Sequence, residues 1–288
     1  MRSLIGLMVL VLAAAAPVRA QTPDAQAPDV QAPDAAPVLA ALRGDYMFVP
    51  SAEVGRGFHI YIRYPEGYDP ANARLYPTVY LIDGDILFPL LAPLQLFLHY
   101  DDGLPEALMV GIAYGGFDPA VNRRNIDFQT PGDGVEQAGA EAFQRFLKTE
   151  LIPLIETRYR SDPDHRVLFG QSRGGVFVLY SAVTDPDLFW GRIASSPSIT
   201  PRIESLLAPA PPARRDDLTL VVASGTRDRA DLQVEAAAWL AAWEERPARP
   251  WVLYGERIEG GTHAADAPAA YRRGMNRLFP RASNPAPP

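Results

Sequence analysis

Short runs of nearly all-apolar residues recur along this 288-residue chain, and they constrain its fold more than any other feature. A strand that is apolar on both faces is typical of a parallel sheet covered by helices on both sides. The chain contains TVYLID (78–83), ALMVGIAY (107–114), RVLFG (166–170), RIASSP (192–197), LTLVVASG (218–225) and WVLYGERIE (251–259). These runs predict the buried strands of one sheet.

Segments with helical periodicity lie between the runs. Apolar residues recur at spacings of three and four over 143–155, which predicts a helix that Pro153 kinks or interrupts. Further helices are expected at about 88–99, 173–184, 231–245 and 265–278. Alternation in FHIYIRYP (58–65) predicts a strand paired with one at about 46–50, as an antiparallel amino-terminal edge. The expected fold is an α/β three-layer sandwich around a mostly parallel central sheet.

Both ends of the chain are expected to lie outside this fold. Residues 1–20 combine an early arginine, an apolar stretch and small residues before Ala20, which predicts a cleaved secretory signal peptide. The stretch is shorter than the roughly 20 residues of a membrane-spanning helix, so no stable membrane anchor is expected after cleavage. Residues 21–38 repeat a Gln-Ala-Pro-Asp unit and predict a disordered linker. The domain is expected over 39–280, followed by a loose tail over 281–288.

Composition excludes some classes of protein. The chain has no cysteine, so an exported form would fold without disulfides, and we expect a periplasmic or secreted protein. Its net charge of −7 disfavours a nucleic-acid partner. Nothing in the sequence indicates the oligomeric state.

One pentapeptide, Gly170-Gln171-Ser172-Arg173-Gly174, matches the pattern G-x-S-x-G. It follows a predicted strand and precedes a predicted helix, which is the setting in which this motif exposes a nucleophilic serine on a tight turn. The alternative is a glycine-rich turn that happens to contain a hydroxyl. We interpret Ser172 as a nucleophile.

A serine nucleophile needs a base, and the chain has four histidines. His263 lies in a glycine-flanked loop after the last predicted strand, where a hydrolase of this architecture presents its base. The other three are expected to be structural or on the surface. A Ser-Lys arrangement is disfavoured because Lys148, the chain's one lysine, lies in the middle of a predicted helix.

The third member should be a carboxylate in a loop between the serine and the histidine in sequence. Asp228 follows the predicted strand 218–225 and is our first choice. Asp231 is the rival, although it also suits the N-cap of the next helix. The order serine, aspartate, histidine is that of the α/β hydrolases.

Backbone N–H groups should stabilise the oxyanion of the tetrahedral intermediate. We expect one from Arg173 and the other from Asp85 in the loop after TVYLID, with Ile86 as second choice. The alternative reading of Asp83-Gly84 is a plain turn.

Several segments together resemble the putative esterase family of α/β hydrolases, which includes esterase D, the periplasmic enterobactin-esterase-like proteins and the feruloyl esterases. The resemblance runs from about Tyr46 to Phe279. It implies an α/β-hydrolase fold, with Ser172 as nucleophile, His263 as base and Asp228 as acid. Its matching pieces are VYLIDGDILF, RRNIDFQTP, FQRFLKTELIPLIETRYR, GQSRGG, DPDLFWGRIASSPSI, SGTRD and GGTHAADAPAAYRRGMNRLF.

Departures from the family pattern flank the serine, where Gln171 and Arg173 replace the more usual His and Leu or Met. Arg173 places a cation in the first turn of a helix, which opposes the helix dipole. We expect it to be compensated by a carboxylate, with Asp85 and Asp127 as candidates, or by an anionic substrate.

Substrate contacts are expected from two loops. The resemblance places RRNIDFQTP beside the active-site cleft, although an Arg-Asp network that only orders this loop is an equal alternative. Phe88, Tyr114, Phe117 and Phe128 are candidates for an apolar pocket, although most aromatic residues of such a domain belong to its core. The substrate-binding candidates are Asp83, Gly84, Ile86, Phe88, Arg123, Arg124 and Asp127.

These residues predict an exported serine hydrolase that cleaves a small-molecule carboxylic ester through an acyl-enzyme, with no metal and no cofactor. An acyltransferase using the same acyl-enzyme is the first alternative. A catalytically inactive hydrolase fold used for binding is the second.

Overall fold

The computed structural model describes residues 39–132, 135–199 and 205–280. The predicted signal peptide (1–20), linker (21–38) and tail (281–288) lie outside the described residues. In the described part, no helix is both long enough and apolar enough to cross a bilayer.

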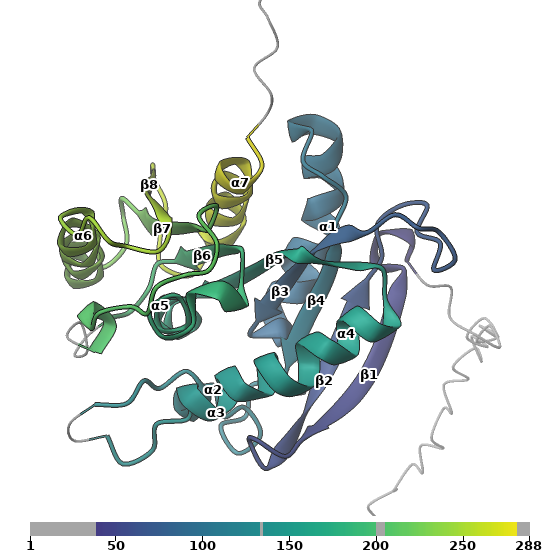
Figure 1. The fold of residues 1–288 in the computed structure, drawn as a ribbon, viewed down its shortest axis with the longest axis horizontal. Coiled ribbons are helices and arrows are strands. Elements are labelled where there is room, and N and C mark those ends of the chain that lie inside the picture. The colour runs from purple at the N-terminus through teal and green to yellow at the C-terminus, as the bar shows by residue number, and fades with distance from the viewer. Residues whose placement is uncertain (1–38, 133–134, 200–204, 281–288) are drawn as a thin grey trace, which may run out of the picture. The chain divides into compact units, whose positions relative to one another are not determined.

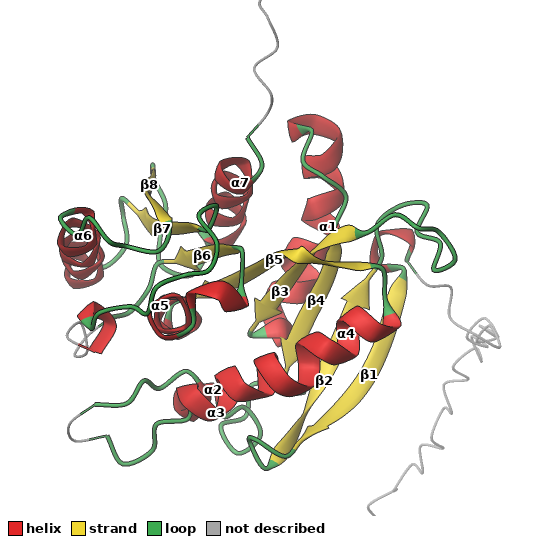
Figure 2. Ribbon diagram, in the orientation of Figure 1, coloured by secondary structure: helices red, strands yellow, loops and turns green. Residues whose placement is uncertain are grey.

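An eight-stranded sheet forms the centre of the domain, with strand order β1-β2-β4-β3-β5-β6-β7-β8 (Figures 1 and 2). β1 pairs with β2, and β2 with β4, in antiparallel register, and all other neighbours are parallel. The predicted sheet with its antiparallel edge is therefore confirmed. The strands are β1 (Gly44–Ser51), β2 (Arg56–Arg63), β3 (Tyr76–Ile82), β4 (Leu108–Ala113), β5 (Ser161–Gln171), β6 (Gly191–Ser195), β7 (Thr219–Gly225) and β8 (Val252–Ile258).

Helices cover both faces of the sheet, as expected for strands that are apolar on both sides. α1 and α7 pack on one face, while α5, α6 and the helical segment from α3 to α4 pack on the other (Figure 1). The helices are α1 (Gly84–Asp102), α2 (Arg124–Asp127), α3 (Ala140–Arg145), α4 (Ile152–Arg158), α5 (Arg173–Thr184), α6 (Ala230–Glu244) and α7 (Ala267–Leu278).

Alternate residues of one strand enter the two halves of the core. In β3, Val79 and Leu81 pack with the α1 and α7 side, whereas Tyr80 and Ile82 pack with the α5 side. This is the period-two alternation of a strand. Since all four side chains are fully buried, the strand reads as one continuous apolar run in the sequence.

The helix predicted over 143–155 is continuous but irregular. A π-helical segment, η2 (Phe146–Leu151), joins α3 to α4, and Pro153 lies in the first turn of α4. A proline cannot donate the usual helical hydrogen bond. The wider π turn before it accommodates that loss, so the helix changes its winding instead of ending.

Candidate active site

Ser172 occupies a strained turn between β5 and α5. Its backbone has φ 58° and ψ −115°, in the positive-φ region that residues other than glycine rarely adopt. Gly170 is required here because a Cβ atom at that position would lie 2.4 Å from the carbonyl oxygen of Gly174. The turn therefore has the backbone geometry that projects a serine from the carboxyl edge of the sheet.

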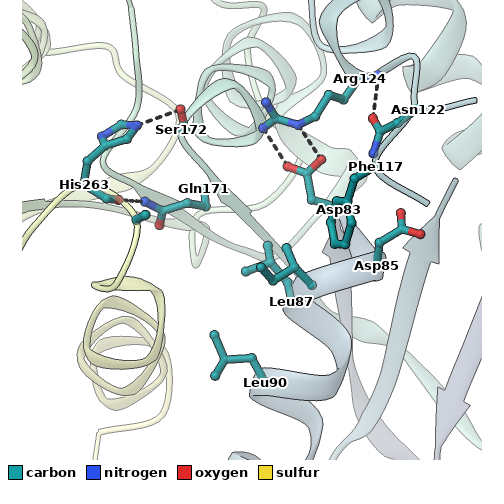
Figure 3. Close-up of a pocket in the computed structure, with 12 residues that line it drawn as sticks. Asp83, Asp85, Leu87, Leu90, Phe117, Asn122, Arg124, Gln171, Ser172 and His263 are labelled. Atoms are coloured by element: carbon teal, nitrogen blue, oxygen red, sulfur yellow. Dashed lines mark hydrogen bonds and ion pairs between the residues drawn. The ribbon is translucent and has the colours of Figure 1, made fainter. Parts of the chain in front are cut away.

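His263 lies in the loop between β8 and α7, and its imidazole contacts Ser172 (Figure 3). Its Nε2 atom is 2.9 Å from Ser172 Oγ. Its Nδ1 atom is 3.1 Å and 3.2 Å from the two carboxylate oxygens of Asp228. An imidazole that donates from Nδ1 and accepts at Nε2 satisfies both contacts. The structure thus brings the three predicted residues into one hydrogen-bonded row.

Asp228 and its rival Asp231 have different surroundings. The Asp228 side chain is only 1% exposed, and one of its oxygens accepts the Arg229 N–H at 2.6 Å. Asp231 lies in the first turn of α6, where its exposed carboxylate pairs with the Arg229 guanidinium. Hydrogen bonding to that guanidinium lowers the pKa of Asp231. Asp228 is the carboxylate that contacts His263.

A cavity of about 330 Å³ lies beside Ser172 and His263. This is within the usual size of small-molecule sites. Its wall is largely apolar, and α1 contributes much of it (Figure 3). The lining residues are Asp83, Asp85, Ile86, Leu87, Leu90, Phe117, Asn122, Arg124, Gln171, Ser172, His263 and Ala264. Among the described residues, no group of three or more His, Asp or Glu side chains is placed to hold a metal ion.

Asp83 and Arg124 form a bidentate ion pair in this cavity (Figure 3). Arg124 donates from Nε at 2.7 Å and from Nη2 at 2.9 Å to the two Asp83 oxygens. Burial raises the pKa of Asp83, and the Arg124 guanidinium opposes that shift. Since each charge compensates the other, the pair adds polar atoms to the cavity without adding net charge.

The predicted oxyanion donors both lie at helix starts. Asp85 is in the first turn of α1 and Arg173 is the first residue of α5, where N–H groups have no acceptor within the helix. The Ile86 N–H instead donates to the Asp83 carbonyl at 3.1 Å. Arg173 and Asp85 therefore remain the expected donors, and Ile86 contributes its side chain to the cavity.

Two predicted substrate contacts lie in the packed interior instead of the cavity. A Cβ atom at Gly84 would lie 2.7 Å from the Ile112 nitrogen, so this glycine lets α1 approach β4. Phe88 is buried on the same helix, with its ring centroid 5.7 Å from that of Tyr61. Of the four candidate aromatic residues, Phe117 lines the cavity, whereas Phe88, Tyr114 and Phe128 are buried in the core.

Two roles were considered for the RRNIDFQTP loop: substrate contact and an Arg-Asp network that orders the loop. The structure places different residues of the loop in each. Arg124 lines the cavity, but Arg123 and Asp127 do not. Arg123 is the N-cap of α2. Asp127 is buried and accepts hydrogen bonds from Arg56 and from the Tyr114 hydroxyl, the latter at 2.9 Å. Asp127 thus belongs to an internal polar network and not to the cavity.

Neither carboxylate that we expected to compensate Arg173 is available, so the carboxylate part of that expectation is wrong and an anionic substrate is the alternative that stays a prediction. The Asp85 oxygens accept the backbone N–H groups of Tyr114 and Gly115, at 2.7 and 2.9 Å. Asp127 is paired with Arg56. Arg173 is exposed, and the described part of the chain gives it no ion pair.

Sequence analysis noted Gln171 as a departure from the family pattern but did not place it, or four other residues, in the lining of a cavity. The five residues are Leu87, Leu90, Asn122, Gln171 and Ala264. Leu90 could have been found, because it lies one helical turn after Ile86. Gln171 could not. Its side-chain amide donates to the main-chain carbonyl of His263 (Figure 3), a contact between residues 92 positions apart.

The chain is similar to known esterases in sequence. Residues 51–265 match the model of a family described as "Putative esterase". The ferri-bacillibactin esterase BesA of Bacillus subtilis is 35% identical over 170 residues, which are 54% of this chain and 58% of that protein. The apo-salmochelin esterase of Escherichia coli is 26% identical over 170 residues, which are 55% of this chain and 52% of that protein. The chain thus spans about half the length of these curated relatives.

Solved structures share the fold at lower sequence identity. The BES protein of Bacillus cereus superposes with a TM-score of 0.71 at 22% identity, covering 86% of this chain and 98% of that one. An IroE-like serine hydrolase of Shewanella oneidensis gives a TM-score of 0.70 at 22% identity, covering 82% of this chain and 80% of that one.

Proposed function

Because the chain belongs to the putative esterase family and has an α/β-hydrolase-like fold, we propose that it is an exported serine hydrolase that cleaves a carboxylic ester. The observation that carries this proposal is the row Ser172, His263 and Asp228, with contacts of 2.9 Å and 3.1 Å, beside a largely apolar cavity. The predicted signal peptide supports export to the periplasm or the medium.

The proposed reaction begins when Ser172 Oγ attacks the ester carbonyl carbon and His263 Nε2 takes the hydroxyl proton. The Asp228 carboxylate orients the imidazole and stabilises its positive charge. Negative charge develops on the carbonyl oxygen, and the Arg173 and Asp85 N–H groups are the proposed donors to it. When the intermediate collapses, His263 gives the proton to the departing alcohol and the acyl group stays on Ser172.

Deacylation repeats these steps with water. His263 takes a proton from the water molecule as its oxygen attacks the acyl carbon, and then returns a proton to Ser172 Oγ as the bond to serine breaks. The products are a carboxylic acid and the free serine. If an alcohol replaced the water, the same acyl-enzyme would give acyl transfer, so product analysis with and without added alcohol separates the two outcomes.

The cavity and the relatives both support a proposal for the substrate class. Ile86, Leu87, Leu90 and Phe117 offer an apolar wall for the part of the ester that lies over α1. Directly after the serine, Arg173 offers an exposed cation that has no ion pair among the described residues, which favours an ester that carries negative charge nearby. The relatives are named as esterases of bacillibactin and salmochelin. We therefore propose siderophore esters as the first candidate substrates.

A substrate panel tests this proposal. Wild-type protein and Ser172→Ala would be incubated with p-nitrophenyl esters of several chain lengths, a feruloyl ester and a catecholate siderophore ester, with products identified by mass spectrometry. We expect wild type to release acid and alcohol from at least one ester, and the variant to release neither. A wild type without activity on any of them would contradict the proposal.

A further inference from the structure

The Gln171 side chain holds the main chain of His263 through a hydrogen bond that could not be predicted from the sequence. Gln171 is the last residue of β5 and pairs with Ser195 of β6, so its backbone is fixed by the sheet. Its side-chain Nε2 donates to the carbonyl oxygen of His263 (Figure 3). The residue before the nucleophile is thereby joined to the residue that serves as its base.

The other side of His263 is also held. The N–H of Thr262, one residue earlier, donates to Asp266 Oδ1 at 2.7 Å. The carbonyl of Gly261 accepts the Arg227 N–H at 2.8 Å, which ties this loop to the loop that carries Asp228. Of these contacts, the Gln171 amide acts on His263 itself.

The Gln171 amide is only half satisfied. Its Oε1 atom is buried and has no hydrogen-bond partner among the described residues. A buried acceptor without a partner is unfavourable for folding. If Gln171 only filled space, an apolar side chain would do so without leaving a buried acceptor unpaired. We therefore attribute the role of Gln171 to its N–H donor.

We propose that Gln171 is a positioning residue that sets the distance between the His263 imidazole and the Ser172 hydroxyl. This inference rests on the proposed function, since it concerns the same serine and histidine. Displacing a catalytic group by about 1 Å can lower a rate by roughly 100-fold. The Nε2 to Oγ distance of 2.9 Å therefore depends on the loop being held in place.

Three variants isolate the donor. Gln171→Leu removes it. Gln171→Glu keeps the shape but presents a carboxylate, which cannot donate to the His263 carbonyl at neutral pH. Gln171→His restores an N–H donor. We expect kcat to fall about 10- to 100-fold in the Leu and Glu variants with KM within about two-fold of wild type, and to recover largely in the His variant.

The reaction of Ser172 with a small fluorophosphonate separates positioning from substrate contact, because Gln171 also lines the cavity. If Gln171 positions His263, the labelling rate falls by the same factor as kcat for every ester. If Gln171 only contacts substrate, labelling is unchanged and KM shifts with the ester, which overturns the inference.

Thr226→Val is the matched control. It removes the 2.8 Å hydrogen bond from the Gly260 N–H, in the His263 loop, to Thr226 Oγ1, in the loop that carries Asp228, together with the 3.4 Å contact of that hydroxyl with Glu259, and neither contact involves His263 itself. We expect it to lower Tm without lowering the labelling rate. Two outcomes would overturn this inference and leave the proposed function standing. One is an equal loss of labelling in Thr226→Val and Gln171→Leu, and the other is an unchanged kcat in both the Leu and Glu variants. A wild type that neither labels nor hydrolyses any ester would overturn the proposed function and the inference with it.

Discussion

His263 Nδ1 faces both carboxylate oxygens of Asp228, at 3.1 and 3.2 Å, from a loop 35 residues later in the chain. Asp228→Asn keeps the shape but removes the charge that stabilises a protonated imidazole. We expect kcat to fall by about 10²- to 10⁴-fold with a small change in KM. Asp231→Asn is the control, because it removes a nearby exposed carboxylate that pairs with Arg229. Steady-state kinetics in which both variants lose activity equally would contradict the assignment.

Removing Arg124 leaves the Asp83 carboxylate buried without its partner. We expect Arg124→Met to lower the free energy of unfolding by about 2–4 kcal/mol, measured by urea denaturation. The double variant with Asp83→Asn should recover most of this loss, since asparagine carries no charge and tolerates the left-handed backbone of residue 83. Failure of the second substitution to restore stability would show that Arg124 acts through packing instead.

Stability should depend on pH through Asp266 at the start of α7. Burial raises the pKa of its carboxyl above the ordinary 3.8. Its contribution is therefore fully present below pH 3.8 and is lost as pH rises through the folded-state pKa. Asp266→Asn can still accept the Thr262 N–H. We expect its Tm to exceed that of wild type at pH 7, with the difference shrinking as pH falls through the folded-state pKa towards 3.8; a lower Tm at pH 7 would contradict this.

Arg173→Leu should act on substrate preference more than on folding. The substitution removes no ion pair that the described residues make, and taking a cation away from the first turn of α5 should raise stability by up to about 1 kcal/mol. For a mono-p-nitrophenyl adipate, whose free carboxylate is anionic, we expect KM to rise about two- to five-fold, with p-nitrophenyl hexanoate unchanged.

Arg158→Leu is the control for that substitution, because Arg158 is exposed in the last turn of α4, before the opposite end of β5. Added salt should reduce the Arg173 effect. Equal kinetics of Arg173→Leu and wild type on the anionic ester would remove Arg173 from substrate recognition.

Local sequence patterns predicted all eight strands. A strand buried on both faces reads as a continuous apolar run, and a strand buried on one face reads as alternating apolar and polar residues. They also predicted the row of Ser172, Asp228 and His263, since each follows a strand and parallel strands present their carboxyl ends at one edge. The short helix α2 (Arg124–Asp127) was not predicted, because four residues carry no periodicity.

Side-chain pairing across long sequence separations could not be predicted. Asp85 turns to the N–H groups of Tyr114 and Gly115, and so is not a partner for Arg173. Phe88 faces the sheet instead of the cavity. Both outcomes depend on where α1 lies against β4, which no local pattern specifies.

Mass-spectrometric mapping of a fluorophosphonate adduct tests the central claim most directly. We predict that wild-type protein carries one adduct, on the peptide containing Ser172, and that Ser172→Ala carries none under the same conditions. A wild type that stays unlabelled, or a Ser172→Ala variant that labels equally, would contradict the assignment of Ser172 as the nucleophile.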